Sequence, residues 1–305
     1  MSASGIRINE VAPRDGLQME SRFVPTADKI AFVDALSDCG FARIEVTSFT
    51  SPRAIPALAD AEIVLREIRR VPGVTYTALV PNVRGMERAI DSRADELNLV
   101  MSCSESHNRA NLRMARTASL AQLVEIVRSA RGAGVPSNVS LSTAFGCPFE
   151  GAVSGDEVAR LATALVEAGA AGVTLCDTTG MAAPTEVRAL IGRLEGVLPL
   201  DAITLHLHDT RGMALANALA ALEAGATSFD ASCAGLGGCP YAPGASGNVG
   251  TELLVHMLAC MGRDTGVDLP RLMEVAGRVP ALVGRALCNP LLLAGPRSRL
   301  HALPA

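Results

Sequence analysis

Short apolar runs rich in β-branched residues alternate along the chain with longer segments whose apolar residues recur at helical spacing. The short runs predict eight β-strands, at residues 6–11, 42–46, 74–80, 96–101, 137–143, 172–176, 203–207 and 227–231. The longer segments predict amphipathic helices, among them residues 27–38, 55–70, 120–133, 156–168, 184–194 and 213–224. Four of these helices are followed by a glycine that can end a helix, at positions 40, 134, 169 and 225.

Repeated strand–helix units indicate a parallel sheet, and eight of them over about 250 residues predict an α/β fold, the (β/α)8 TIM barrel. A doubly wound open sheet is the competing interpretation. An open sheet of this kind often binds its ligand at a glycine-rich turn after the first strand. No G-x-G-x-x-G or G-x-x-x-x-G-K-[ST] motif follows any predicted strand here. We expect residues 1–305 to form a single barrel domain with additional C-terminal helices. These peripheral helices take up about residues 264–305, and prolines at 270, 280, 290, 296 and 304 are expected to break them.

Composition excludes several classes of protein. Of the 305 residues, 49% are hydrophobic, enough for a large core, while a net charge of −4 and an aromatic content of 3% argue against nucleic-acid binding. Eight scattered cysteines without a C-x-x-C pair indicate reduced thiols. The chain begins without a secretory signal pattern and has no apolar run of about 18 residues, so we expect a cytoplasmic protein with no membrane partner.

The segment His206-Leu207-His208-Asp209 ends the seventh predicted strand. Side chains alternate along a strand, so both imidazoles point to the same face and make a candidate site for a divalent metal. A pair of structural histidines explains this short pattern equally well.

Other polar residues follow the predicted strands in the same way. They are Arg14 and Asp15 after the first strand, Glu45 near the end of the second, Ser142 and Thr143 at the end of the fifth, and Asp177 after the sixth. Barrel enzymes assemble their active sites at this carboxyl end, so these segments are predicted to converge. Asp15 is a candidate oxygen ligand or an ordinary turn aspartate. Arg14 is a candidate clamp for an anion or an enolate, or a surface arginine.

Residues 233–250 follow the last strand and contain six glycines. Such a loop can be an ordinary flexible surface loop, or a lid that approaches a ligand closely. In the lid interpretation, Cys239 can supply or remove a proton and Asn248 can offer a carbonyl oxygen to a metal. The only lysine, Lys29, lies in the first predicted helix, away from the strand ends, so a Schiff-base aldolase mechanism is excluded.

Several motifs resemble those of the 3-hydroxy-3-methylglutaryl-CoA lyase family, in register over about residues 6–262. They are EVAPRDGLQ at 10–18, IEVTSFTSP at 44–52, SESHN at 104–108, FGCPFEG at 145–151, HLHDTRGMALAN at 206–217 and, most specific, GLGGCPYAPGASGNVGTE at 235–252. The resemblance implies a lyase that splits 3-hydroxy-3-methylglutaryl-CoA into acetyl-CoA and acetoacetate by a retro-Claisen reaction. It also implies a place in leucine degradation and ketone-body metabolism.

The resemblance further implies site residues and partners. Mg²⁺ or Mn²⁺ would be held by Asp15, His206, His208 and Asn248. Arg14 would stabilise the enolate and bind substrate with Gln18, Cys239 would be the catalytic thiol, and Glu45 and Asp177 would be further catalytic acids. We expect an acyl-CoA substrate and a homo-oligomer (a dimer).

Four departures from the family pattern border the acyl pocket: Met19, Cys176, Arg211 and Met213. A related 3-hydroxy-3-alkylglutaryl-CoA therefore stays open as the substrate. Two other functions also stay open. One is a Claisen-type synthase of the same superfamily, such as isopropylmalate or homocitrate synthase, although these usually have a C-terminal extension and lack the glycine-rich loop. The other is a non-catalytic barrel that binds an acyl-CoA or a metal.

Overall fold

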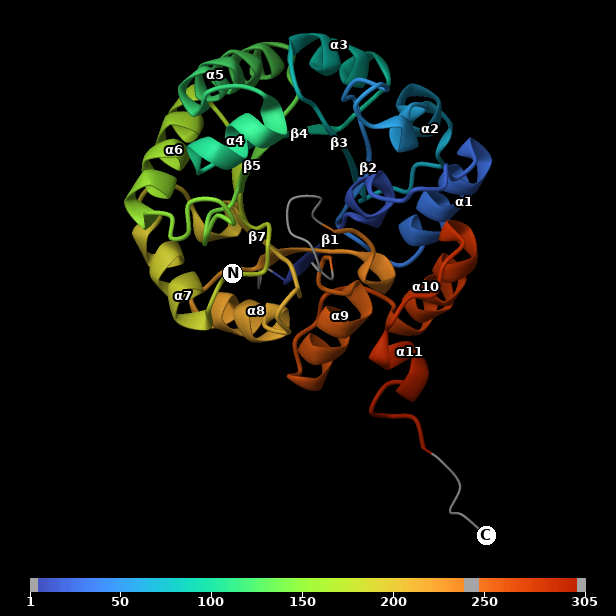
Figure 1. Ribbon diagram of the computed structural model, residues 1–305. Helices are drawn as coiled ribbons and strands as arrows, with labels where there is room; N and C mark the ends of the chain where they lie inside the picture. The colour runs from blue at the N-terminus through green and yellow to red at the C-terminus, as the bar shows by residue number, and fades with distance from the viewer. Residues whose placement is uncertain (1–4, 239–246, 301–305) are drawn as a thin grey trace.

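The computed structural model of the protein describes residues 5–238 and 247–300. In this part of the chain, parallel strands close into a barrel in chain order (Figure 1). The strands are β1 (Arg7–Glu10), β2 (Arg43–Ser48), β3 (Thr75–Leu79), β4 (Glu96–Ser102), β5 (Ser137–Ser142), β6 (Gly172–Asp177), β7 (Ile203–Leu207) and β8 (Ser228–Ala231). All eight predicted strands are thus confirmed. The pairing of β1 with β8 closes the sheet and rules out the open-sheet alternative.

Helices surround the barrel as an outer ring (Figure 1). Those between the strands are α1 (Thr26–Ser37), α2 (Ala61–Glu67), α3 (Val83–Asp91), α4 (Glu105–Leu112), α5 (Arg116–Gly132), α6 (Gly155–Ala168), α7 (Pro184–Arg193) and α8 (Ala214–Glu223). The four glycines predicted to end helices all have positive φ, for example 110° at Gly169 after α6. In the described residues, no helix combines the length and the apolar character that a membrane span requires.

One predicted helix is wrong in extent. Residues 55–70 form a 3₁₀ turn, Pro56–Leu58, followed by the shorter helix α2. Pro56 has no N–H to donate and occupies the first position of the turn, while Ile68 leaves the helical region with a ψ of 145°. The helical spacing of apolar residues continues across both breaks, so the sequence pattern alone predicts one long helix.

The C-terminal part forms α9 (Thr251–Cys260), α10 (Leu269–Val283) and α11 (Pro290–Ala294), outside the barrel (Figure 1). The expectation that prolines break these helices is wrong at three positions. Pro270 and Pro290 lie in the first turn, where a missing N–H costs nothing, and they begin helices instead. Pro280 lies inside the last turn of α10, which continues to Gly284, where a φ of 75° ends it.

The barrel wall has an apolar outer face and a polar inner face. On β4, Leu97, Leu99 and Met101 are completely buried in the hydrophobic core, while Asn98 between them faces other polar side chains. Asn98 donates a hydrogen bond to Glu45 at 2.8 Å, and its carbonyl oxygen accepts one from Ser140 at 3.0 Å. Barrels are usually filled with branched apolar residues, so this interior is unusual.

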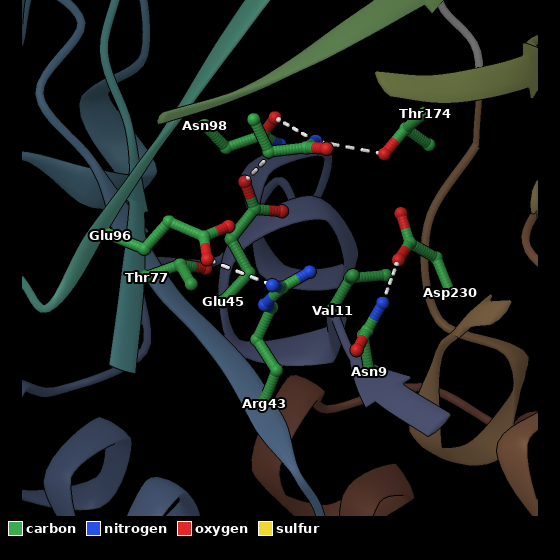
Figure 2. Close-up of a pocket in the computed structure, with 10 residues that line it drawn as sticks. Asn9, Val11, Arg43, Glu45, Thr77, Glu96, Asn98, Thr174 and Asp230 are labelled. Atoms are coloured by element: carbon green, nitrogen blue, oxygen red, sulfur yellow. Dashed lines mark hydrogen bonds and ion pairs between the residues drawn. The ribbon is translucent and has the colours of Figure 1, made fainter. Parts of the chain in front are cut away.

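A small cavity of about 20 Å³ lies among these inner side chains (Figure 2). Its volume suffices for about one water molecule. Glu45, in the middle of β2, and Asp230, near the carboxyl end of β8, both line this cavity. The polar interior is therefore continuous with the polar residues at the carboxyl ends of the strands, which we call the rim. Side chains inside the barrel can thus hold the rim residues in place.

Candidate metal centre and active site

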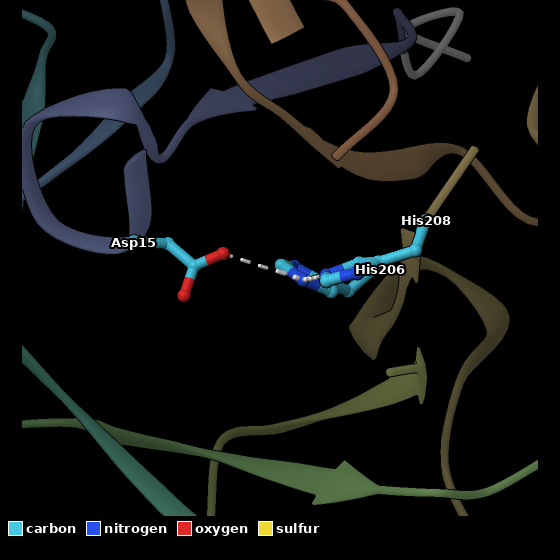
Figure 3. Close-up of side chains that lie close together, drawn as sticks. All are labelled: Asp15, His206 and His208. Carbon is cyan, nitrogen blue, oxygen red and sulfur yellow. Dashed lines mark hydrogen bonds and ion pairs between the residues drawn. The ribbon is translucent and has the colours of Figure 1, made fainter. Parts of the chain in front are cut away.

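Asp15, His206 and His208 lie together at the carboxyl end of the barrel (Figure 3). One ligand atom from each lies within 4.8 Å of the other two, and all three residues are buried. The two imidazole Nε2 atoms are 3.2 Å apart, and Asp15 Oδ2 is 3.9 Å from His206 Nε2. The predicted convergence of the first and seventh strand ends is confirmed.

The protonation states in this cluster suit a cation. Burial and the neighbouring His206 lower the pKa of His208 to about 3, so its ring is neutral at pH 7. Burial works against the charged form of Asp15. The charges of Arg14 and His206, together with the hydrogen bond from Asn248, outweigh it and lower the pKa of Asp15 to about 2. A carboxylate and two imidazoles converging in a buried space are donors that first-row divalent metals and Mg²⁺ accept.

The turn that carries Asp15 begins directly after β1. It is a single π-helical turn, Ala12–Gly16, in which the N–H groups of residues 14, 15 and 16 all point to the carbonyl of Val11. Gly16 is required there, because a Cβ at this position would lie 2.8 Å from Cβ of Leu236. The turn therefore packs closely against the start of the glycine-rich segment.

Asn248 also contacts the cluster and pairs with His208 through an isolated antiparallel bridge. Its amide Nδ2 donates to Asp15 Oδ2 at 2.7 Å and to the carbonyl of Leu236 at 3.0 Å. The amide nitrogen thus faces Asp15, and a role as metal ligand would use the carbonyl oxygen instead. Asn248 thus lies close to the proposed metal ligands, as predicted, while its own role as a ligand stays a proposal.

Arg14 is buried and held between two carboxylates. Its Nε and Nη2 both lie 2.6 Å from Glu45 Oε2, and its Nη1 lies 2.6 Å from Asp15 Oδ1. Although burial disfavours the guanidinium charge, the charges of Glu45 and Asp15 raise the pKa of Arg14. Burial also raises the pKa of Glu45, against the effect of Arg14. A surface role for Arg14 is therefore excluded.

Asp177 ends β6 at the same rim. Its Oδ1 accepts a hydrogen bond from the backbone N–H of Met181 at 2.7 Å, while its Oδ2 is buried without a hydrogen-bond partner in the described part of the chain. Burial raises the pKa of Asp177 to about 6, even though Met181 and Arg211 act in the opposite direction. A carboxyl group that titrates near neutral pH and has an unused oxygen is suited to proton transfer.

Gln18 and Cys239 are the two remaining predicted site residues. Gln18 follows the turn that carries Arg14, and its Oε1 is buried with no hydrogen-bond partner among residues 5–238 and 247–300. Cys239 lies outside the described residues. Lys29 is buried in the first turn of α1, where its Nζ lies 2.6 Å from both Asp60 Oδ1 and the carbonyl of Ala57.

Sequence reasoning missed three residues that contact the site. Asp230 Oδ2 lies 3.2 Å from His206 Nδ1, and Asn98 donates a hydrogen bond to Glu45 from inside the barrel. Glu10 accepts hydrogen bonds from the N–H groups of Ala12 and Cys233, at 2.8 and 2.9 Å. Only strand alternation pointed to them, since each is a polar residue in a buried strand.

Comparison with known proteins identifies the family. A family model described as HMGL-like matches residues 5–279. The chain belongs to the HMGL-like family. Among its relatives, the hydroxymethylglutaryl-CoA lyase of Bacillus subtilis is 46% identical over 282 residues, which cover 92% of this chain and 94% of the relative. The mitochondrial hydroxymethylglutaryl-CoA lyase of Gallus gallus is 41% identical over 286 residues, covering 94% and 93%.

Solved structures of hydroxymethylglutaryl-CoA lyases have the same fold as this chain. An HMG-CoA lyase from Acinetobacter baumannii, in complex with coenzyme A and 3-methylmalate, is 45% identical and covers both chains fully with a TM-score of 0.96. The HMG-CoA lyase of Bacillus subtilis has a TM-score of 0.92 at 45% identity, over 95% of this chain and 97% of that one. The resemblance predicted from the motifs and the TIM-barrel fold are both confirmed.

Proposed function

We propose that this protein is a metal-dependent carbon–carbon lyase that cleaves 3-hydroxy-3-methylglutaryl-CoA into acetyl-CoA and acetoacetate. The observation that carries the proposal is the buried cluster of Asp15, His206 and His208 beside Arg14, in a chain that shares 46% identity with a hydroxymethylglutaryl-CoA lyase over nearly its whole length. A closely related 3-hydroxy-3-alkylglutaryl-CoA is the second candidate substrate, because Arg211 and Cys176 depart from the usual family pattern.

Asp15, His206, His208 and the carbonyl oxygen of Asn248 would hold a divalent cation, Mg²⁺ or Mn²⁺. The bound cation would act as a Lewis acid that lowers the pKa of the tertiary hydroxyl of the substrate and orients it. Asp15 is ionised at neutral pH and His208 is neutral, so both are ready to bind without losing a proton.

We assign Asp177 as the base that accepts the proton of the tertiary hydroxyl on its Oδ2. As the hydroxyl oxygen becomes the ketone of acetoacetate, the carbon–carbon bond breaks and its electron pair passes to the acetyl-CoA fragment as an enolate. The pKa of about 6 lets Asp177 act as a carboxylate at pH 7 and still accept a proton readily.

Arg14 would stabilise the negative charge of the enolate oxygen. Its guanidinium is fixed by Glu45 and Asp15, so little reorganisation is needed when the charge develops. The carbon of the enolate must then gain a proton to give acetyl-CoA. We assign that proton to the Cys239 thiol, because this cysteine lies in the glycine-rich motif at 235–252 that resembles the lyase family.

A coupled assay for acetyl-CoA release tests the proposal. Enzyme supplied with Mn²⁺ is expected to release acetyl-CoA from 3-hydroxy-3-methylglutaryl-CoA, to lose this activity in excess EDTA, and to regain it when Mn²⁺ is restored. The H208A variant should not regain it. Activity that survives chelation would refute the metal dependence, and consumption of acetyl-CoA with a 2-oxo acid would favour a synthase.

The thiol is tested separately. C239S is expected to lower kcat by about 100-fold or more while Mn²⁺ binding is unchanged. C260S is the matched control, because Cys260 is an exposed cysteine on α9. An unchanged rate in C239S would remove the thiol from the mechanism. The cytoplasmic location and the dimer stay predictions, and sedimentation equilibrium would test the dimer.

A further inference from the structure

Asp230 is the penultimate residue of β8 and faces the barrel interior, where it lines the small cavity (Figure 2). Its two carboxylate oxygens have different partners. Oδ2 lies 3.2 Å from Nδ1 of His206, and Oδ1 accepts a hydrogen bond from Asn9 Nδ2 at 2.8 Å. The carboxylate therefore bridges a proposed metal ligand and a neutral amide on the far side.

Strand register creates this bridge. Asp230 is the paired residue of His206 on β7 and of Asn9 on β1. Paired residues of neighbouring strands face the same side of a sheet, so the three side chains meet inside the barrel. Asn9 is fixed in turn, because its Nδ2 also lies 3.3 Å from Ser228 Oγ. The position of the carboxylate is thus set by the sheet itself and not by a loop.

The bridge determines which nitrogen of His206 is free. An imidazole that donates its Nδ1–H to a carboxylate has a lone pair on Nε2. In His206, Nε2 is the nitrogen that faces Asp15 and His208. His208 is different, since its Nδ1 is buried without a hydrogen-bond partner in the described residues.

We propose that Asp230 is a positioning residue for the metal centre, which keeps the proton of His206 on Nδ1 and directs the Nε2 lone pair toward the cation. This inference rests on the metal site of the proposed function. Charge supports it as well. Together, Asp15, Glu45 and Asp230 against Arg14 leave a formal excess of two negative charges, which one divalent cation offsets.

The isosteric change D230N separates this role from simple packing. If the new amide turns its oxygen to His206, its NH₂ group meets the Nδ2 donor of Asn9. If it turns its NH₂ to His206, Nδ1 must accept and the proton moves to Nε2, where a metal would bind. Both arrangements disfavour metal binding. Loss of such a hydrogen-bond partner typically lowers metal affinity by about 10- to 100-fold, and we expect a loss of this size here.

The experiment titrates chelator-stripped protein with Mn²⁺ and measures free Mn²⁺ by its EPR signal. D230N is expected to bind Mn²⁺ about 10- to 100-fold more weakly than wild type. Its kcat at saturating Mn²⁺ should stay within a few-fold of wild type, because Asp230 acts through His206. E96Q is the matched control. It removes another carboxylate from the same cavity, but one that pairs with Arg43 at the amino end of the barrel, and it should bind Mn²⁺ normally.

Each outcome has one meaning. Wild-type Mn²⁺ affinity in folded D230N would overturn the proposal, and equal weakening in E96Q would show a general effect of interior charge in place of positioning. Failure of the wild-type protein to bind Mn²⁺ would instead refute the metal site of the proposed function. If D230N does not fold, N9A provides the test. It frees Oδ1 of Asp230 but keeps the carboxylate, so Mn²⁺ binding should weaken, and unchanged binding would overturn the proposal.

Discussion

Glu45 of β2 holds the guanidinium of Arg14 through a single oxygen, Oε2, which lies 2.6 Å from both Nε and Nη2. The remaining nitrogen, Nη1, donates to Asp15, so one planar group joins the second strand to the proposed metal ligand. Only arginine has donors arranged to bind both carboxylates at once. This rigid fork explains how an arginine can be ready for an enolate without moving.

The first prediction follows from that fork. R14K keeps the positive charge but cannot contact Glu45 and Asp15 in the same geometry. We expect kcat for acetyl-CoA release to fall by about 100- to 1,000-fold, the usual loss when a fixed oxyanion donor is removed. Mn²⁺ affinity, measured by titration, should change little because Asp15 remains.

R43K is the control for this exchange. Arg43 also pairs with a carboxylate, that of Glu96, on the inner face of the barrel, but at its amino end. Its conversion to lysine should leave kcat close to wild type. Equal losses in R14K and R43K would show that the barrel tolerates no such exchange and that Arg14 has no special role.

The second prediction concerns pH. Burial raises the pKa of Asp177 to about 6, and the proposed base must be ionised to accept a proton. The value of kcat/KM at saturating Mn²⁺ should therefore fall as pH decreases below about 6. D177N should be slow at every pH and should lack this decrease, the acidic limb of the pH profile. A wild-type limb retained in D177N would assign it to another group.

The third prediction tests the loop that follows Asp177. Arg211 Nη1 donates to the carbonyls of Thr179 and Gly180, at 2.9 and 2.8 Å, and its charge lowers the pKa of Asp177. R211Q should therefore move the acidic limb of kcat/KM to higher pH, by a fraction of a unit. Exposed Arg188, which pairs with Glu223, provides the control variant R188Q. A limb at the wild-type pH in R211Q would contradict the prediction.

Much of the site follows from strand periodicity and one topological rule. Once eight strand–helix units are recognised, the carboxyl ends of all strands must meet, so Asp15, His206 and Asp177 can be placed together without knowing any contact. The structure confirms this for residues separated by nearly 200 positions in sequence. Lys29 could be excluded by the same rule.

The supporting residues could not be predicted this way, because they depend on register and local geometry. Asp230 contacts His206 only because β7 and β8 pair those two positions, and a shift of one residue would turn it toward the helices. Similarly, a single sequence does not distinguish a π-helical turn at Ala12–Gly16 from an ordinary Asp-Gly turn. The polar interior was equally hidden, since polar residues in strands usually indicate a solvent-exposed face.

The last prediction concerns Glu10, which joins the turn of Arg14 to the start of the glycine-rich segment. Its Oε1 accepts the N–H groups of Ala12 and Cys233, and its Oε2 accepts the hydroxyl of Thr251 at 2.8 Å. Burial raises its pKa from 4.5 to about 8. Between these two values the folded protein keeps a proton that the unfolded chain has lost. The free energy of unfolding therefore decreases as pH rises through this window.

E10Q resembles the protonated acid at every pH and should remove this dependence. Between pH 5.5 and pH 8.5, wild type is expected to lose stability on the order of a few kcal/mol more than E10Q. At pH 5.5 the two should be similar, because the carboxamide oxygen that E10Q introduces can still accept both backbone N–H groups. Urea denaturation at the two pH values measures the difference. Glu252, whose pKa burial raises to about 7, is present in both proteins, so parallel losses would mean that Glu10 is ionised in the folded state.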